Sequence, residues 1–190
     1  MAKEFDPQIL NTAFLGVMSQ GLAKMAPIVA SEEPKVKAVA IEEYNGRMRI
    51  SPGIEKLKST SYISVVNFYI NQGDLERHKP KGAMVFYLEL ENAGKFFKSQ
   101  GIAFAEDEDD KSMMDACGKW CAAIAGELKS ALSSQGYVPL VLSAPQNYKN
   151  NVVQGVEFSS DQMVKQEITF SYFKHPTIVV ELTMAPLPKK

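Results

Sequence analysis

The sequence has few of the residues that usually hold metals or form disulfides. It contains two cysteines and two histidines among 190 residues, whereas a structural zinc site takes about four such ligands. Cys117 and Cys121 are four residues apart, and His78 and His175 fall in separate predicted loops. We therefore predict no bound metal and no disulfide framework. Two free cysteines are typical of a reducing compartment, so we expect a cytoplasmic protein.

Two further absences exclude whole classes of protein. The 21 basic residues are balanced by 22 acidic ones, whereas a general nucleic-acid binder needs a basic surface. No apolar run approaches the roughly 20 residues of a membrane-spanning helix. The first residues also lack the apolar stretch of a secretory signal. The length suits a single domain, which we place over residues 1–190.

Common catalytic and ligand-binding motifs are missing as well. The chain has no GxSxG and no P-loop sequence. The acidic run EDEDD (106–110) lacks the central glycine and distal glutamate of an EF-hand loop. Acidic residues ahead of a helix favour its dipole, which explains the run without a ligand. These patterns predict no catalytic residue, no metal ligand and no cofactor.

The chain does contain clear helical and strand periodicities. Apolar residues at helical spacing predict a helix over 7–25, and segments rich in β-branched and aromatic residues predict strands over 61–70 and 82–90. The other predicted elements are a strand at 35–44, a short helix ending near Gly101, a helix from a Ser112 cap to about Ser134, and strands at 138–144, 163–173 and 176–185. A helix followed by a strand and a long hairpin occurs twice, which suggests duplication of an αβββ-like unit.

The helix that includes DACGKWCAAIAGELKSAL (115–132) carries two distinct stripes. One stripe is apolar and predicts the core face: Cys117, Trp120, Cys121, Ile124, Leu128, Ala131 and Leu132. The cysteines then serve as small buried side chains. The second stripe consists of Asp115, Lys119, Ala122 and Gly126. Its small residues would let another backbone approach closely, although an ordinary solvated face fits the same pattern.

The spacing of this second stripe resembles a known family. The pattern D/S-x3-E-x2-N-x22-P marks the CheC/CheX/FliY chemotaxis phosphatases, and here Asp115 and Pro145 occupy its first and last positions. Ile124-Ala125-Gly126 and Lys129 also match the family's usual helix. The resemblance extends over about residues 8–186 and is closest to the single-site CheX type. It implies an α+β fold, with long helices packed on a largely antiparallel sheet.

Two departures from the pattern affect the expected activity. The family's glutamate and asparagine, which enter the receiver's active site and orient water, are replaced by Lys119 and Ala122. Alanine has no hydrogen-bonding group, and lysine cannot act as a carboxylate. Positioning and electrostatics carry phosphoryl transfer, so this loss should remove most of the acceleration. The resemblance therefore implies a docking surface without the catalytic groups.

Three hypotheses about function follow. The first is a non-catalytic CheX-like signalling domain that binds a partner, such as a phosphorylated receiver domain, through Asp115, Lys119, Ala122 and Gly126. The second is an active phosphatase that uses Asp115, Lys119 or a residue outside the motif. The third is an oligomerisation module, with a homodimer formed through an exposed sheet edge. The retained spacing from Asp115 to Pro145 favours the first two.

Overall fold

The computed structural model describes residues 7–23, 32–99, 109–150, 155–172 and 175–190. In chain order the elements are α1 (Pro7–Ala23), β1 (Lys35–Ala40), β2 (Glu43–Tyr44), β3 (Arg47–Met48), α2 (Gly53–Leu57), β4 (Ser61–Tyr69), α3 (Gln72–Glu76), β5 (Gly82–Glu89), α4 (Leu90–Ser99), α5 (Asp110–Ser134), β6 (Val141–Leu142), β7 (Gln146–Lys149), β8 (Val164–Tyr172) and β9 (His175–Met184). The predicted long helices and the two predicted hairpins are therefore present. Gly101, where the short helix was expected to end, lies outside the described residues.

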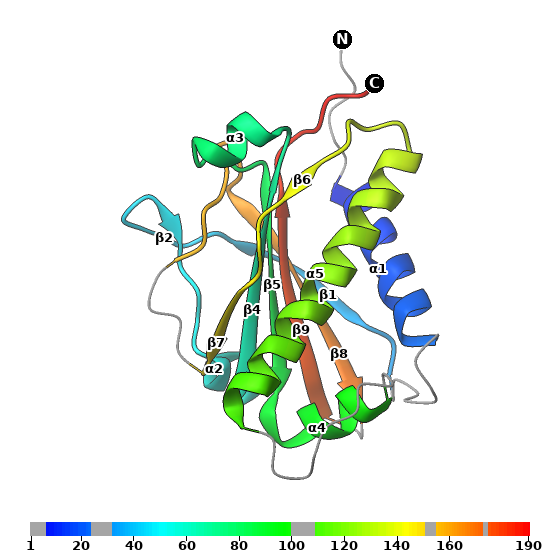
Figure 1. Ribbon diagram of the computed structural model, residues 1–190, viewed down its shortest axis with the longest axis vertical. Helices are drawn as coiled ribbons and strands as arrows, with labels where there is room; N and C mark the ends of the chain where they lie inside the picture. Colours follow the sequence, from blue (N-terminus) through cyan, green and yellow to red (C-terminus); the bar gives the residue numbers. More distant parts are fainter. Residues whose placement is uncertain (1–6, 24–31, 100–108, 151–154, 173–174) are drawn as a thin grey trace.

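The main sheet has seven strands and is antiparallel throughout. Its order is β1-β8-β9-β5-β4-β6, and β7 also pairs with β4. Figure 1 shows α1 and α5 side by side across one face of this sheet. This arrangement confirms the predicted α+β fold with long helices on an antiparallel sheet.

The strand order divides the chain into two similar units. One unit consists of α1, β1, β4 and β5, and the other of α5, β7, β8 and β9. The two units meet where β5 pairs with β9, and each contributes an edge strand to the other, since β1 pairs with β8 and β7 with β4. The topology is thus that of two αβββ units, while their origin by duplication remains a prediction.

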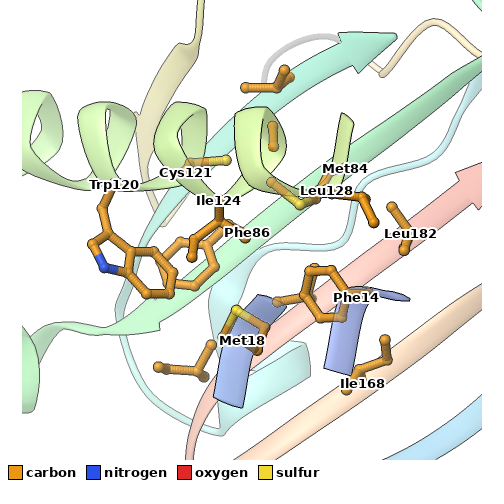
Figure 2. Close-up of a cluster of buried hydrophobic side chains, with 14 of the residues drawn as sticks. Phe14, Met18, Met84, Phe86, Trp120, Cys121, Ile124, Leu128, Ile168 and Leu182 are labelled. Carbon is orange, nitrogen blue, oxygen red and sulfur yellow. The ribbon is translucent and has the colours of Figure 1, made fainter. Parts of the chain in front are cut away.

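The larger core lies between the sheet and the two long helices. Phe14 and Met18 of α1 meet Phe86 of β5 and the apolar stripe of α5 in this layer (Figure 2). Trp120 packs against Phe86, with 4.7 Å between ring centroids, and against Phe96 of α4 at 5.1 Å. β4 and β5 are buried along their whole length. Burial on both faces explains why their sequences are nearly continuous apolar runs.

A smaller core covers the opposite face of the sheet. Ile63, Val65 and Val85 point to this side and contact Met48 and Leu57, which come from the segment between β1 and β4. Val156 joins the cluster, and its backbone pairs with that of Met48. We call the two layers the helix-side core and the outer core.

The predicted strand at 35–44 is interrupted. β1 ends at Ala40, and Glu43–Tyr44 pairs instead with Arg47–Met48. Asn45 and Gly46 between them have φ angles of 52° and 72°, as a type I′ hairpin turn requires. The Asn-Gly signal for this turn was present in the sequence and was missed.

Other predicted boundaries also need correction. The predicted strand at 138–144 is only Val141–Leu142, and it is followed by β7, which was not predicted. Pro145 separates the two strands, because proline has no N–H to donate to a sheet. Two short helices were not predicted: the segment 47–59 contains α2, and the 71–81 connection contains α3. β9 begins at His175, which was expected in the connecting loop.

Candidate functional site

α5 begins earlier than the sequence suggested. The predicted Ser112 cap is wrong: the N-cap is Asp109, whose side chain accepts a 2.8 Å hydrogen bond from the Ser112 N–H. This bond holds the pKa of Asp109 below its ordinary value. Asp109 and Ser112 are three residues apart and both are good capping residues, so the sequence pattern alone did not distinguish them.

The first turn of α5 is attached to the sheet through Asp110. Its carboxylate accepts hydrogen bonds from Lys149 Nζ of β7 at 2.5 Å and from the Tyr62 hydroxyl of β4 at 2.9 Å. The hydrogen bond from Lys149, followed by that from Tyr62, lowers the pKa of Asp110. The start of the helix is therefore held at a defined place beside β4 and β7. Residues 106–108 of the acidic run lie outside the described residues.

The apolar stripe of α5 faces the core as predicted. Trp120, Cys121, Ile124 and Leu128 are all buried in the helix-side core (Figure 2). Both cysteines are free and buried, and burial raises the pKa of Cys117 to about 12. A thiol protonated at neutral pH is a poor nucleophile, so the cysteines fit the predicted structural role.

The second stripe lies on the side of α5 that points away from the sheet. We call its four residues, Asp115, Lys119, Ala122 and Gly126, the outer face of α5. Asp115 and Lys119 are exposed, whereas Ala122, expected to be exposed, is half-buried like Gly126. A Cβ built on Gly126 would meet nothing within 4 Å. Within the described part of the chain, Lys119 and Asp115 make no ion pair. The outer face therefore combines two small, half-buried residues with two exposed charges that have no ion-pair partner among the described residues.

A glycine on the flank of this face sets how closely α5 approaches the sheet. A Cβ on Gly118 would collide with the side-chain amide of Asn147 in β7. Asn147 in turn accepts a 2.9 Å hydrogen bond from the Ser64 hydroxyl of β4. Glycine within a helix costs roughly 0.5–1 kcal/mol relative to alanine, and here it permits this contact. The sequence signal was a mid-helix glycine, which was not interpreted in this way.

The outer face has limited chemistry of its own. Lys119 offers an ammonium group that can attract an anion, and Asp115 offers a carboxylate one turn away. Position 122 carries only a methyl group, so no amide lies beside them to orient water. Among the described residues, no group of three or more histidine, cysteine, aspartate or glutamate side chains is placed to hold a metal. No described helix has the length and hydropathy to cross a membrane.

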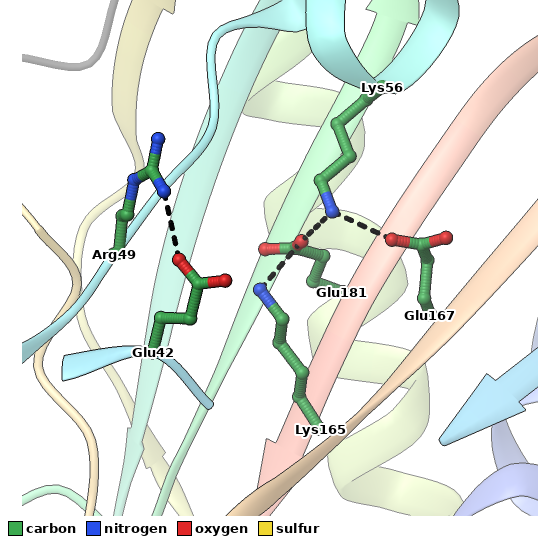
Figure 3. A network of polar contacts seen from close by, with 6 residues as sticks. All are labelled: Glu42, Arg49, Lys56, Lys165, Glu167 and Glu181. Carbon is green, nitrogen blue, oxygen red and sulfur yellow. Dashed lines mark hydrogen bonds and ion pairs between the residues drawn. The ribbon is translucent and has the colours of Figure 1, made fainter. Parts of the chain in front are cut away.

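A second polar cluster lies in the outer core, far from α5. Lys56 Nζ contacts Glu167 at 2.7 Å and Glu181 at 2.6 Å, and Lys165 Nζ contacts Glu181 at 2.7 Å (Figure 3). Burial lowers the pKa of Lys56, but the two carboxylates together raise it by more, so the net shift is upward. We call these four residues the buried charge network. Its members come from three separate elements, so no local sequence pattern indicates that they meet.

Solved structures, but neither family models nor curated proteins, include matches to this chain. Among solved structures, chemotaxis protein CheX from Vibrio vulnificus is 14% identical, with 91% of this chain and 97% of that chain covered and a TM-score of 0.58. A CheX-CheY-BeF3-Mg²⁺ complex from Borrelia burgdorferi matches at 16% identity, 92% and 96% coverage and a TM-score of 0.55. FliY from Thermotoga maritima is 12% identical, with 95% of this chain and 92% of that chain covered and a TM-score of 0.53.

Proposed function

We propose that this protein is a CheX-like chemotaxis signalling domain, which binds a receiver domain of a response regulator without dephosphorylating it. The chain has the fold of the CheC/CheX/FliY proteins, which supports this role. Contact would be made through the outer face of α5. The observation that carries the proposal is the placement of Asp115, Lys119, Ala122 and Gly126 together on the accessible side of one long helix. The structural neighbour in which CheX is bound to CheY supports the class of partner.

The lack of catalysis follows from the chemistry of positions 119 and 122. A water molecule that attacks an aspartyl phosphate has to be oriented by a hydrogen-bonding side chain. Ala122 offers none, and the cationic Lys119 cannot accept a proton from water while it is charged. Lys119 can still attract a phosphoryl group, which favours binding of the phosphorylated form over the free form.

The test uses a receiver domain of the same organism labelled with acetyl phosphate. The wild-type protein should bind the phosphorylated receiver and should leave its rate of phosphate loss unchanged. The double variant Lys119→Glu with Ala122→Asn should accelerate phosphate loss, and each tenfold gain corresponds to about 1.4 kcal/mol of barrier. The matched control is Lys119→Glu with Ala123→Asn, because Ala123 is exposed on the same helix but lies outside the outer face.

Two results would contradict this proposal. Rapid turnover by the wild type would show an active phosphatase with a different set of residues. Binding of no receiver by the wild type or by the double variant would favour the third hypothesis, an oligomerisation module.

A homodimer is a second proposal, carried by the exposed edge of the sheet. Strand β1 pairs only with β8 in the described part of the chain, and most of its residues are exposed. Val36 of β1 and Val164 of the neighbouring strand β8 are 39% and 46% exposed. An exposed edge strand can pair with a second chain. Sedimentation should detect a dimer, and Ala38→Pro should shift it to monomer because proline removes a donor from the edge; a wild type that stays monomeric would contradict it.

A further inference from the structure

A polar cavity lies on the sheet face opposite α5, outside the proposed docking surface. Its volume is about 360 Å³, within the range of about 300–1,000 Å³ usual for small-molecule sites. Side chains from β3, β4, the α3 region, the β6–β7 connection and the segment after Gly155 converge on it. Hydrophobic contact is available from Val65, Leu75 and Val156. The cavity therefore combines an apolar wall with polar side chains, among them Asn67, Tyr69 and Glu157.

Asn67 of β4 brings an unpaired polar group to this cavity. Its side chain lines the cavity and is only 7% exposed, yet its amide oxygen has no hydrogen-bond partner among the described residues. Leaving a buried acceptor unpaired costs about 1–3 kcal/mol. The backbone of Asn67 is satisfied, since its N–H donates to the Ser143 hydroxyl and its carbonyl accepts from the Ser143 N–H. Only the side chain therefore lacks a donor, and a ligand in the cavity could supply one.

Charged groups of both signs lie beside Asn67. Glu157 accepts hydrogen bonds from the Tyr69 hydroxyl at 3.1 Å and pairs with His78 Nδ1 at 2.9 Å, and Arg47 lies 3.9 Å away. Burial, followed by the charge of Glu157, raises the pKa of Tyr69 to about 12, so Tyr69 stays a donor. The positive charge of Arg47 and the negative charge of Glu157 balance each other. The cavity is thus close to neutral but strongly dipolar.

The backbone of His78 adds an independent observation. It has a φ of 53°, in the left-handed region, and its side chain is 74% exposed. Such backbone strain in a non-glycine residue costs of order 1–3 kcal/mol and clusters at ligand-binding sites. Here the strained position holds the imidazole against Glu157 at the rim of the cavity.

We propose that this cavity binds a small zwitterion of the α-amino-acid type with an apolar side chain. The ammonium group donates to the Asn67 amide oxygen and lies near Glu157, and the carboxylate lies toward Arg47 and His78. The hydrocarbon side chain packs on Val65, Leu75 and Val156. A ligand that is neutral overall but has separated charges complements a site with the same property.

The test uses L-leucine as the probe, with two analogues that each lack one charged group. 3-Methylbutylamine lacks the carboxylate, and 4-methylpentanoate lacks the ammonium group. Titration followed by two-dimensional ¹H–¹⁵N NMR should shift the amides of cavity residues with leucine. Each analogue should bind at least about tenfold more weakly, the change expected from losing one hydrogen bond to a charged group. No leucine-dependent shifts at cavity residues, or equal affinity for the analogues, would overturn the proposal.

Substitutions of residues that line the cavity test whether leucine binds there. Asn67→Val should weaken leucine binding at least about tenfold. The same change should leave the melting temperature unchanged or raise it, because it removes an unpaired acceptor. Glu157→Gln keeps the shape and should also weaken binding. Asn11→Ala is the matched control: Asn11 also has an unpaired buried amide oxygen, but it lies in α1 on the other face. Leucine binding that survives Asn67→Val would overturn the proposal.

Discussion

The two faces of the sheet are packed by different means. The helix-side core consists of hydrocarbon and aromatic side chains from α1, α4, α5 and the sheet (Figure 2). The outer core combines a smaller apolar cluster with the buried charge network (Figure 3). Filling of volume should therefore govern stability on the first face, whereas complete pairing of charges should govern it on the second. Four variants test this difference, in order of decreasing expected effect.

Trp120→Ala should have the largest effect. Trp120 is 4% exposed and packs between Phe86 and Phe96, so its removal leaves a cavity in the helix-side core. The free energy of unfolding should fall by roughly 3–5 kcal/mol. Urea denaturation followed by circular dichroism gives this value. A loss below about 1 kcal/mol would mean that this face does not depend on filled volume.

Glu181→Ala should cost about 3 kcal/mol, near the lower end of the range for breaking a buried ion pair. Glu181 is fully buried and is the partner of both Lys56 and Lys165. Lys56 keeps Glu167, so Lys165 is the ammonium group that loses its ion-pair partner among the described residues. The same denaturation experiment measures the change. An effect near zero would show that water reaches Lys165 in the variant.

Replacing both Lys165 and Glu181 with apolar side chains should lower the free energy of unfolding far less than removing Glu181 alone. In the double variant Lys165→Met with Glu181→Leu, both charges are removed and the volume is largely kept. Buried ion pairs replaced in this way are often neutral or stabilising by about 1–4 kcal/mol. We expect a stability close to that of the wild type. A double variant as unstable as Glu181→Ala would show that the charges themselves, rather than their balance, hold the outer core together.

Lys119→Ala should have the smallest effect and provides the reference for both faces. Lys119 is exposed on α5, makes no ion pair among the described residues and contacts neither core. Its substitution should change the unfolding free energy by no more than about 0.5 kcal/mol. A larger loss would mean that the outer face of α5 contributes to folding, which would weaken its assignment to partner binding.

Periodicity in the sequence was enough to predict the main elements. The helices near 7–25 and 112–134 and the hairpins of β4–β5 and β8–β9 all have long, regular apolar patterns, which local physics largely determines. The residues of the outer face were predicted from spacing alone. The structure confirms that they share one accessible side of α5, while their binding role stays a prediction.

The features that were missed depend on contacts between distant segments. α2 and α3 have five residues each, too few for a helical period to appear. β7 is a strand because it pairs with β4, although its sequence, QNYK, is polar. The Gly118–Asn147 contact, the buried charge network and the cavity beside Asn67 each join segments far apart in the chain. Such juxtapositions arise from tertiary structure and leave no local pattern.

The exchange of edge strands between the two αβββ units constrains how the chain can be made. β1 pairs with β8 from Lys35–Thr169 to Ala40–Val164, so the one sheet partner that β1 has among the described residues follows it much later in the sequence. A ribosome that synthesises the protein releases β1 long before β8 exists. Until β8 is made, β1 of the first unit has no strand to pair with. Sheets that depend on such non-local pairing form slowly. Completion of the sheet therefore has to wait until β8 has been synthesised, and a truncated chain that stops before β8 should be prone to aggregation.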